Sequence, residues 1–151
     1  MSTQDLQWLL IRKTNSNIVK QKGLGRVFTR ETGNVSALHN YKCSSLVNDK
    51  SVSIVPAKDG KGVLVATHKS KANPRAIKNT YNVHHVQGGA RRVAGAVANI
   101  VAKSGYRPDL RKASVARATA IVNAQRCAVR EPRQRAPRGA AARKAAAAAE
   151  Q

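Results

Sequence analysis

The side chains that most often carry chemistry are few in this sequence and stand far apart. Its seven carboxylates are spread singly along the chain, so no neighbouring pair is available for general acid–base catalysis. His39 and Cys43 are spaced i, i+4, as two metal ligands on one helix would be, but no second pair has the spacing that zinc needs. His84 and His85 are adjacent and would point to opposite faces of a strand. We therefore predict no catalytic residue and no metal site.

Two glycine-containing segments match phosphate-binding loops only in part. Gly23 and Gly25 are followed by Phe28 where the dinucleotide fingerprint requires its third glycine. The segment Gly60-Lys61-Gly62 lacks the earlier glycine and the Ser or Thr of a nucleotide P-loop. We expect no cofactor, no small-molecule substrate and no enzymatic activity. An enzyme whose site forms only in the folded chain is kept as a remote alternative.

The chemistry that this sequence favours is electrostatic. The 151 residues include 28 Lys and Arg against 7 Asp and Glu, which gives a formal net charge of +21. The net charge of a small soluble domain is usually about 2 to 8 in magnitude. Neutralisation of phosphates releases counterions, and this favourable effect needs many cations rather than a special motif. Three tyrosines, one tryptophan and one phenylalanine are too few for the aromatic rows that bind single strands. The sequence therefore favours structured RNA or a duplex backbone, recognised by shape and phosphates.

The cations are spread along the whole chain rather than collected in one tail. Residues 1–125 carry a net charge of +16, and residues 126–151 carry +5. The folded part of the chain must therefore present a cationic surface of its own. The candidate RNA-binding residues are Arg12, Lys13, Lys20, Lys22, Arg26, Lys42, Lys58, Lys61, Lys69, Lys71, Arg75, Lys78, Arg91, Arg92, Lys103, Arg107, Arg111, Lys112, Arg117, Arg126, Arg130, Arg133, Arg135 and Arg138.

The apolar pattern predicts that the chain begins with a short helix. Leu6, Leu9 and Leu10 recur at helical spacing, which favours a helix that ends near Arg12. A buried strand over the same run is the alternative. Trp8 stands among these apolar residues and is expected in the core rather than on an RNA-stacking surface.

A small antiparallel sheet with a central hairpin is expected next. Residues 51–55 and 63–68 are rich in β-branched side chains and flank the turn pair Asp59-Gly60, which predicts the hairpin. Shorter candidate strands lie at residues 18–20, 26–29 and 79–84.

Two C-terminal helices and a basic tail complete the prediction. The first helix has an apolar stripe formed by Val93, Val97, Ile100 and Val101. It is expected to stop at Gly105, and a second helix is expected to begin at Pro108. The sequence from Glu131 onward is rich in Pro, Arg and Ala without periodicity and is predicted to be disordered when free. We therefore predict an α+β domain over residues 1–125 and a basic tail over residues 126–151.

Several segments resemble one known family. The run Tyr106-Arg107-Pro108-Asp109-Leu110-Arg111, with its continuation Arg117-Ala118-Thr119-Ala120-Ile121, closely resembles the last helix of the eukaryote-specific large-subunit ribosomal protein family numbered twenty-eight. Three further pieces agree in order and spacing, namely Leu6-Gln7-Trp8, Pro56-Ala57 and Asp59-Gly60-Lys61-Gly62-Val63. The resemblance covers about residues 1–125. After Gln125 an Ala/Arg-rich tail replaces the short Lys/Arg-rich ending of the family.

The resemblance implies a structural constituent of the large (60S) cytosolic ribosomal subunit, on its solvent side. Such a protein binds large-subunit ribosomal RNA, supports translation and contacts neighbouring ribosomal proteins. The implied location is the cytoplasmic ribosome, with transit through the nucleus and nucleolus during assembly. A homo-oligomer is not expected. A membrane partner is not expected either, because no run approaches the ~20 apolar residues that a membrane-spanning helix requires.

Two other function classes remain open at this point. The nearest is a nucleolar ribosome-assembly factor, because the family is similar in its N-terminal half to such a protein. A histone-like chromatin protein is the less favoured alternative, suggested by the Ala/Lys/Arg-rich end of the chain.

Overall fold

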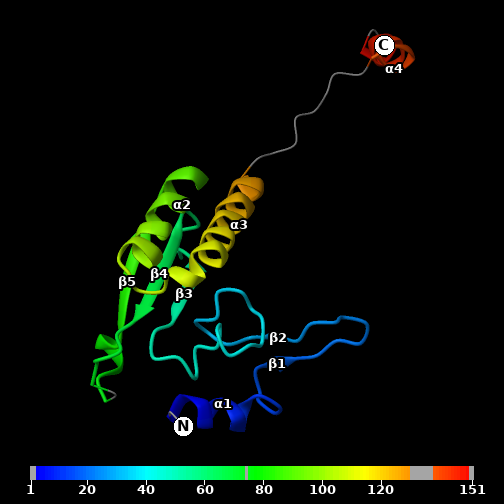
Figure 1. Ribbon diagram of the computed structural model, residues 1–151. Helices are drawn as coiled ribbons and strands as arrows, with labels where there is room; N and C mark the ends of the chain where they lie inside the picture. The colour runs from blue at the N-terminus through cyan, green and yellow to red at the C-terminus, as the bar shows by residue number, and fades with distance from the viewer. Residues whose placement is uncertain (1–2, 74, 130–137, 150–151) are drawn as a thin grey trace.

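The computed structural model describes residues 3–73, 75–129 and 138–149, and all statements below refer to these residues. It has the α+β composition expected from the sequence (Figure 1). The elements along the chain are α1 (Thr3–Ile11), β1 (Ile18–Val19), β2 (Phe28–Thr29), β3 (Val52–Pro56), β4 (Val63–His68), the 3-10 turn η1 (Ile77–Asn79), β5 (Tyr81–Val86), α2 (Ala90–Ala98), the π-helical turn η2 (Asn99–Lys103), the 3-10 turn η3 (Pro108–Leu110), α3 (Arg111–Val129) and α4 (Ala140–Ala149).

The centre of the fold is a three-stranded antiparallel sheet in the order β3-β4-β5. Ile54 of β3 pairs with Val65 of β4, so their side chains lie on the same face of the sheet. That face is buried, with Ile54 1% and Val65 0% exposed. The connection between β3 and β4 contains Gly60 at a φ of 70°, a left-handed conformation that glycine adopts without strain. The hairpin predicted from the sequence is therefore confirmed.

Helices α2 and α3 cover the buried face of the sheet and pack against each other (Figure 1). Val93, Val97 and Val101 are fully buried on this side, as the apolar stripe in the sequence predicts. The first helix changes after Ala98 into the wider π-helical turn η2 instead of continuing as an α-helix. Gly105 follows with a φ of 69°, which ends the helical segment at the expected residue. Pro108 then opens η3, which leads directly into α3.

Residues 3–50 contain few regular elements. Strands β1 and β2 pair over two residues each. Helix α1 forms as predicted, but none of its residues is buried. Leu6, Leu9 and Leu10 are 55%, 49% and 69% exposed. Trp8 is half-buried and lies against the rings of His39 and Tyr41, with centroids 5.1 and 5.8 Å away. The helix therefore attaches through an aromatic cluster outside the main core, and its leucines face outward.

The C-terminal part of the described chain is more helical than the sequence predicts. Helix α4 covers Ala140–Ala149, within the tail for which the sequence predicts no order. Alanine has the highest helix propensity of all residues, which explains a helix in this alanine-rich run. Helix α3 also continues to Val129, beyond the predicted domain end at residue 125.

Candidate nucleic-acid interface

An open hollow of about 1070 Å³ lies where the β3–β4 turn, the start of α2 and the C-terminal half of α3 meet. These three segments contribute Lys61, Arg92 and Arg126 to its lining. The other lining residues are Gly60, Gly62, Gln87, Gly88, Gly89, Val122 and Gln125, so no carboxylate lines it within the described chain. We call this site the cationic hollow. Three positive side chains around one space without a competing acid form a favourable place for phosphate groups.

One glycine and one carboxamide hold the cationic hollow in shape. Gly62 has a φ of 85°, and a Cβ at this residue would clash with the carbonyl oxygen of Val86. Gly62 N–H donates to Oε1 of Gln125 (3.0 Å), and Nε2 of Gln125 donates to the Gly62 carbonyl oxygen (2.9 Å). This pair of hydrogen bonds ties the hairpin turn to α3, and so keeps Lys61 and Arg126 in the same region.

The start of α2 adds backbone donors to the cationic hollow. Gly89 is the N-cap residue, and within the described chain no side chain caps this helix. Gly88 precedes it at a φ of 131°, where a Cβ would lie 2.9 Å from Cδ of Arg92. The N–H groups and the positive dipole end at a helix start favour anions. The backbone therefore adds to the attraction that the three side chains exert on an anion.

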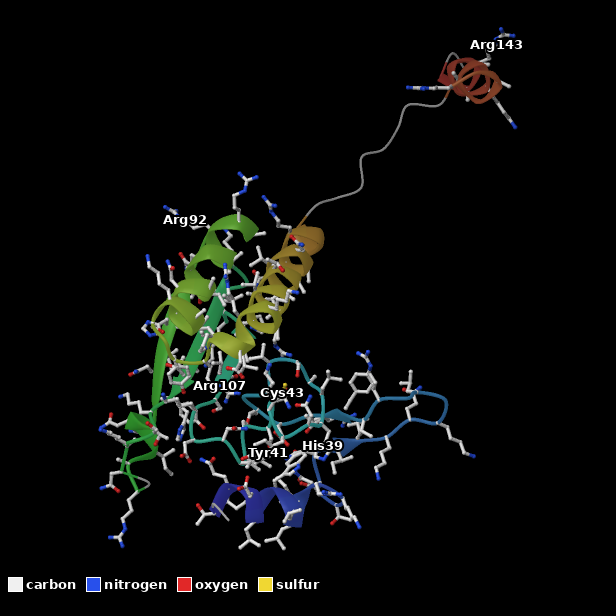
Figure 2. All side chains as sticks on the ribbon, viewed as in Figure 1. His39, Tyr41, Cys43, Arg92, Arg107 and Arg143 are labelled. Carbon is white, nitrogen blue, oxygen red and sulfur yellow. The ribbon has the colours of Figure 1, made fainter. Side chains whose placement is uncertain are left out.

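Arg107, which is labelled in Figure 2, is one of the RNA-binding candidates, and its guanidinium is engaged by the protein itself. Its Nε and Nη2 each donate to a carboxylate oxygen of Asp109, both at 2.9 Å. Its Nη1 and Nη2 donate to the carbonyl oxygens of Lys50 (2.7 Å) and Lys42 (2.8 Å). The hydrogen bond from Arg107 lowers the pKa of the Asp109 carboxyl. Arg107 thus fastens the segment after η2 to residues 42–50.

Arg117 makes a second internal tie, from α3. Its Nε donates to the carbonyl oxygen of Ile54 in β3 (2.9 Å), and its Nη1 donates to that of Val35 (3.4 Å). The side chain therefore joins α3 both to the sheet and to the N-terminal part of the chain. RNA contacts by Arg107 and Arg117 remain a prediction, and the hydrogen bonds give both residues a structural role.

Most other candidates project into solvent from loops and from the outer sides of α2 and α3. Lys69 is half-buried. Apart from those in the cationic hollow, the exposed candidates are Arg12, Lys13, Lys20, Lys22, Arg26, Lys42, Lys58, Lys71, Arg75, Lys78, Arg91, Lys103, Arg111, Lys112 and Arg138. Arg130, Arg133 and Arg135 lie outside the described residues.

Four exposed cations were not among the candidates, namely Arg30, Lys50, Arg143 and Lys144. All four are plain Lys or Arg in the sequence, so a list of every basic residue would have included them. Nζ of Lys50 lies 5.8 Å from the ring centroid of Tyr106, in cation–π range. The sequence analysis also missed the pair of hydrogen bonds between Gln125 and Gly62, because no local pattern indicates a contact between residues 63 positions apart.

Of the residues considered for metal binding, His39 makes a hydrogen bond through its ring. His39 Nε2 donates to the carbonyl oxygen of Arg12 (2.9 Å). His84 and His85 follow each other in β5 and point to opposite faces, as expected for a strand. Among the described residues, no group of three His, Cys, Asp or Glu side chains gathers as a metal site. No described helix is long and apolar enough to cross a membrane.

Comparison with known proteins places this chain in a family. The sequence model of the Ribosomal L28e protein family matches residues 6–124. The chain is 36% identical over 129 residues to the large ribosomal subunit protein eL28 of Schizosaccharomyces pombe, which covers 82% of this chain and 93% of the relative. It is 27% identical over 120 residues to the large ribosomal subunit protein eL28 of Caenorhabditis elegans, covering 80% and 88%. The chain belongs to the Ribosomal L28e protein family, as the resemblance in its sequence indicates.

Proposed function

We propose that this protein is a structural constituent of the large ribosomal subunit and binds ribosomal RNA through the cationic hollow and the exposed cations around it. Its relatives are named as large-subunit proteins, which supports the ribosomal role. The observation that carries the RNA contact is the convergence of Lys61, Arg92 and Arg126, from three separate elements, on a space without carboxylates.

The rigid setting of these cations supports a shape-dependent mode of binding. Arg92 belongs to a helix that packs on the sheet, and Arg126 belongs to the helix that Gln125 ties to the hairpin turn. Side chains on rigid supports lose less conformational freedom when they meet a fixed array of phosphates. Ribosomal RNA presents such an array, and double-stranded RNA is recognised mostly by shape and by backbone contacts.

We assign the protein no catalytic role, because a phosphate-binding surface of this kind requires only positioned cations. Its partners are then large-subunit ribosomal RNA and neighbouring ribosomal proteins. Its location is the cytoplasmic ribosome, after passage through the nucleolus during subunit assembly.

The RNA contact is tested by changing Lys61, Arg92 and Arg126 together to glutamine and measuring binding to large-subunit ribosomal RNA at several salt concentrations. We expect weaker binding and a salt slope reduced by up to about one unit for each lost phosphate contact. The matched control changes Arg138, Arg143 and Lys144 to glutamine, which removes the same charge from the tail. If both variants lose the same affinity, the cationic hollow is not the main contact.

The cellular role is tested by sedimentation of the endogenous protein on sucrose gradients. We expect it in the fractions of large subunits, monosomes and polysomes. Confinement to nuclear pre-ribosomal particles would replace the structural role with that of an assembly factor. Recovery with chromatin would favour the histone-like alternative.

A further inference from the structure

The three-stranded sheet leaves one face exposed. Helices α2 and α3 cover the face that carries Ile54 and Val65 (Figure 1). On the opposite face Val55, Tyr81 and Val83 are 42%, 48% and 61% exposed. We call it the outer sheet face, and the strand register arranges it in the rows Val55–Leu64–His85, Ser53–Ala66–Val83 and His68–Tyr81. Contiguous apolar surface left to solvent is typical of interaction sites.

The charge of the outer sheet face differs from that of the rest of the molecule. Strands β3, β4 and β5 contain no Lys, Arg, Asp or Glu, although the chain has 28 Lys and Arg in all. The helices on the other side expose Arg92, Lys112 and Arg126. Phosphates are bound by cations, whereas apolar and aromatic side chains form the centres of protein–protein interfaces. The outer sheet face is therefore unsuited to RNA and suited to a protein.

Part of the outer sheet face is already fixed in place. Nδ1 of His68 donates to the carbonyl oxygen of Asp49 (2.6 Å). The His68 ring meets the Tyr81 ring edge to face, with centroids 5.2 Å apart. The hydroxyl of Tyr106 donates to the His68 carbonyl oxygen. A half-exposed tyrosine held in this way is a suitable anchor, because little side-chain freedom remains to be lost on binding.

The border of the outer sheet face indicates the charge of the partner. The connection from β4 to β5 has four cations and no acidic residue, namely Lys69, Lys71, Arg75 and Lys78. It leaves the sheet directly, since the N–H of Lys69 donates to the carbonyl oxygen of Thr80 (2.9 Å). A second copy of the chain would bring a net charge of +21 against the same charge, which repulsion disfavours. A partner with acidic residues at the matching border would be attracted.

We propose that the outer sheet face is the docking surface for another protein of the large subunit, one whose contact patch is apolar at its centre and bordered by Asp and Glu. The inference rests on the proposed function, because it requires the chain to stand in a large subunit. The protein then has two binding surfaces on opposite sides of the sheet. Its helical side meets RNA, and its outer sheet face meets protein.

The test places a photo-reactive residue in the full chain within assembled large subunits. In one version p-benzoylphenylalanine replaces Val83 on the outer sheet face. In the matched control it replaces Asn123, an exposed residue on α3. Subunits that carry either version are purified and irradiated, and the cross-linked peptides and RNA are identified. We expect Val83 to link to one other protein, at a surface with Asp or Glu around the adduct, and Asn123 to link to RNA.

The outcomes separate this inference from the proposed function. If the tagged wild-type chain does not enter large subunits, the proposed function fails. If it enters them and the residue at Val83 links to RNA, to a second copy of the chain or to nothing, only the docking inference is overturned. A protein surface bordered by Lys and Arg would overturn it as well.

A pair of substitutions provides a second readout. Val83→Glu adds a charge at an exposed strand position, and Val83→Thr keeps the β-branched shape without one. For a partner with an apolar centre and an acidic border, Val83→Glu should lower co-purification of the cross-linked protein by about tenfold or more, because it buries an unpaired charge against the apolar centre and adds repulsion from the nearby acidic border. Val83→Thr should change it by less than about threefold, as threonine fits a strand well. Equal retention in both variants would contradict the docking surface.

Discussion

Residues 52–129 and residues 3–50 are held together by different interactions. In the first region valine and isoleucine of β3, β4, α2, η2 and α3 form most of the buried core, with Val52, Val63 and Val97 all 0% exposed. From the second region only Val35 belongs to the core cluster of the described residues. Apolar burial therefore stabilises the sheet and helices. The N-terminal segment depends on hydrogen bonds and ring contacts.

Individual contacts show how the N-terminal segment is fastened. Gln4 Nε2 donates to Asp49 (2.7 Å), and the Tyr41 hydroxyl donates to Asp5 (3.0 Å). Arg107 adds the ties to residues 42 and 50 from the other region. Such bonds each contribute about 0.5–1.5 kcal/mol net, less than a fully buried aliphatic side chain does. We therefore expect the N-terminal segment to open before the sheet and helices unfold.

The largest effect is expected where the core is tightest. Ile54→Ala removes a side chain that is 1% exposed and should lower the free energy of unfolding by about 2–5 kcal/mol. Leu10→Ala is the control in the other region, and its 69% exposure should keep the change within about 0.5 kcal/mol. Urea unfolding of both variants measures the difference. Similar losses would show that the N-terminal segment shares the core after all.

A smaller effect is expected at the tie between the two regions. Arg107→Gln leaves the carbonyl oxygens of Lys42 and Lys50 and the Asp109 carboxylate without this partner, and should cost about 1–3 kcal/mol. Arg111→Gln is the matched control, because it removes the same charge from an exposed position. Hydrogen exchange should become faster in residues 42–50 of the Arg107 variant only. Equal exchange in the two variants would rule out the tie.

The pH dependence of the same tie has a defined sign. Arg107 lowers the folded pKa of Asp109 through its hydrogen bond. The stabilisation is therefore complete above the ordinary aspartate pKa of about 3.9 and is lost as the pH falls through the lowered folded value. Thermal unfolding between neutral and acidic pH should show an acid-induced loss that Asp109→Asn reduces. An unchanged acid profile in that variant would remove Asp109 from the tie.

The smallest effect is expected at helix α1. The hydrogen bond to Asp5 raises the pKa of the Tyr41 hydroxyl, so this bond is present below the ordinary tyrosine pKa of about 10 and is lost as the pH rises through the raised folded value. Hydrogen–deuterium exchange of α1, corrected for the intrinsic pH dependence, should increase at alkaline pH in the wild type. Tyr41→Phe should lack this pH step and should exchange faster already at neutral pH. The same step in Tyr41→Phe would assign it to another group.

Local patterns in the sequence were enough to predict most elements between residues 52 and 129. Alternating β-branched residues around Asp59-Gly60 identify the hairpin, because the period of a strand and the chemistry of a turn are local properties. The stripe of Val93, Val97 and Val101 identifies the first helix for the same reason. The resemblance around Tyr106 identified the family, which the comparison over residues 6–124 confirms.

The tertiary structure alone decided what each cation and each leucine does. Arg107 and Arg91 have the same charge in the sequence, but only the fold brings the carbonyl oxygens of Lys42 and Lys50 within reach of Arg107. Leu6 and Leu10 have the spacing of a buried stripe, but in the folded chain they face outward. The cationic hollow joins residues 61, 92 and 126, and no spacing rule connects positions so far apart. Sequence patterns determine the elements because they report local periodicity, whereas long-range packing determines which side chains are buried, bonded or free to meet a partner.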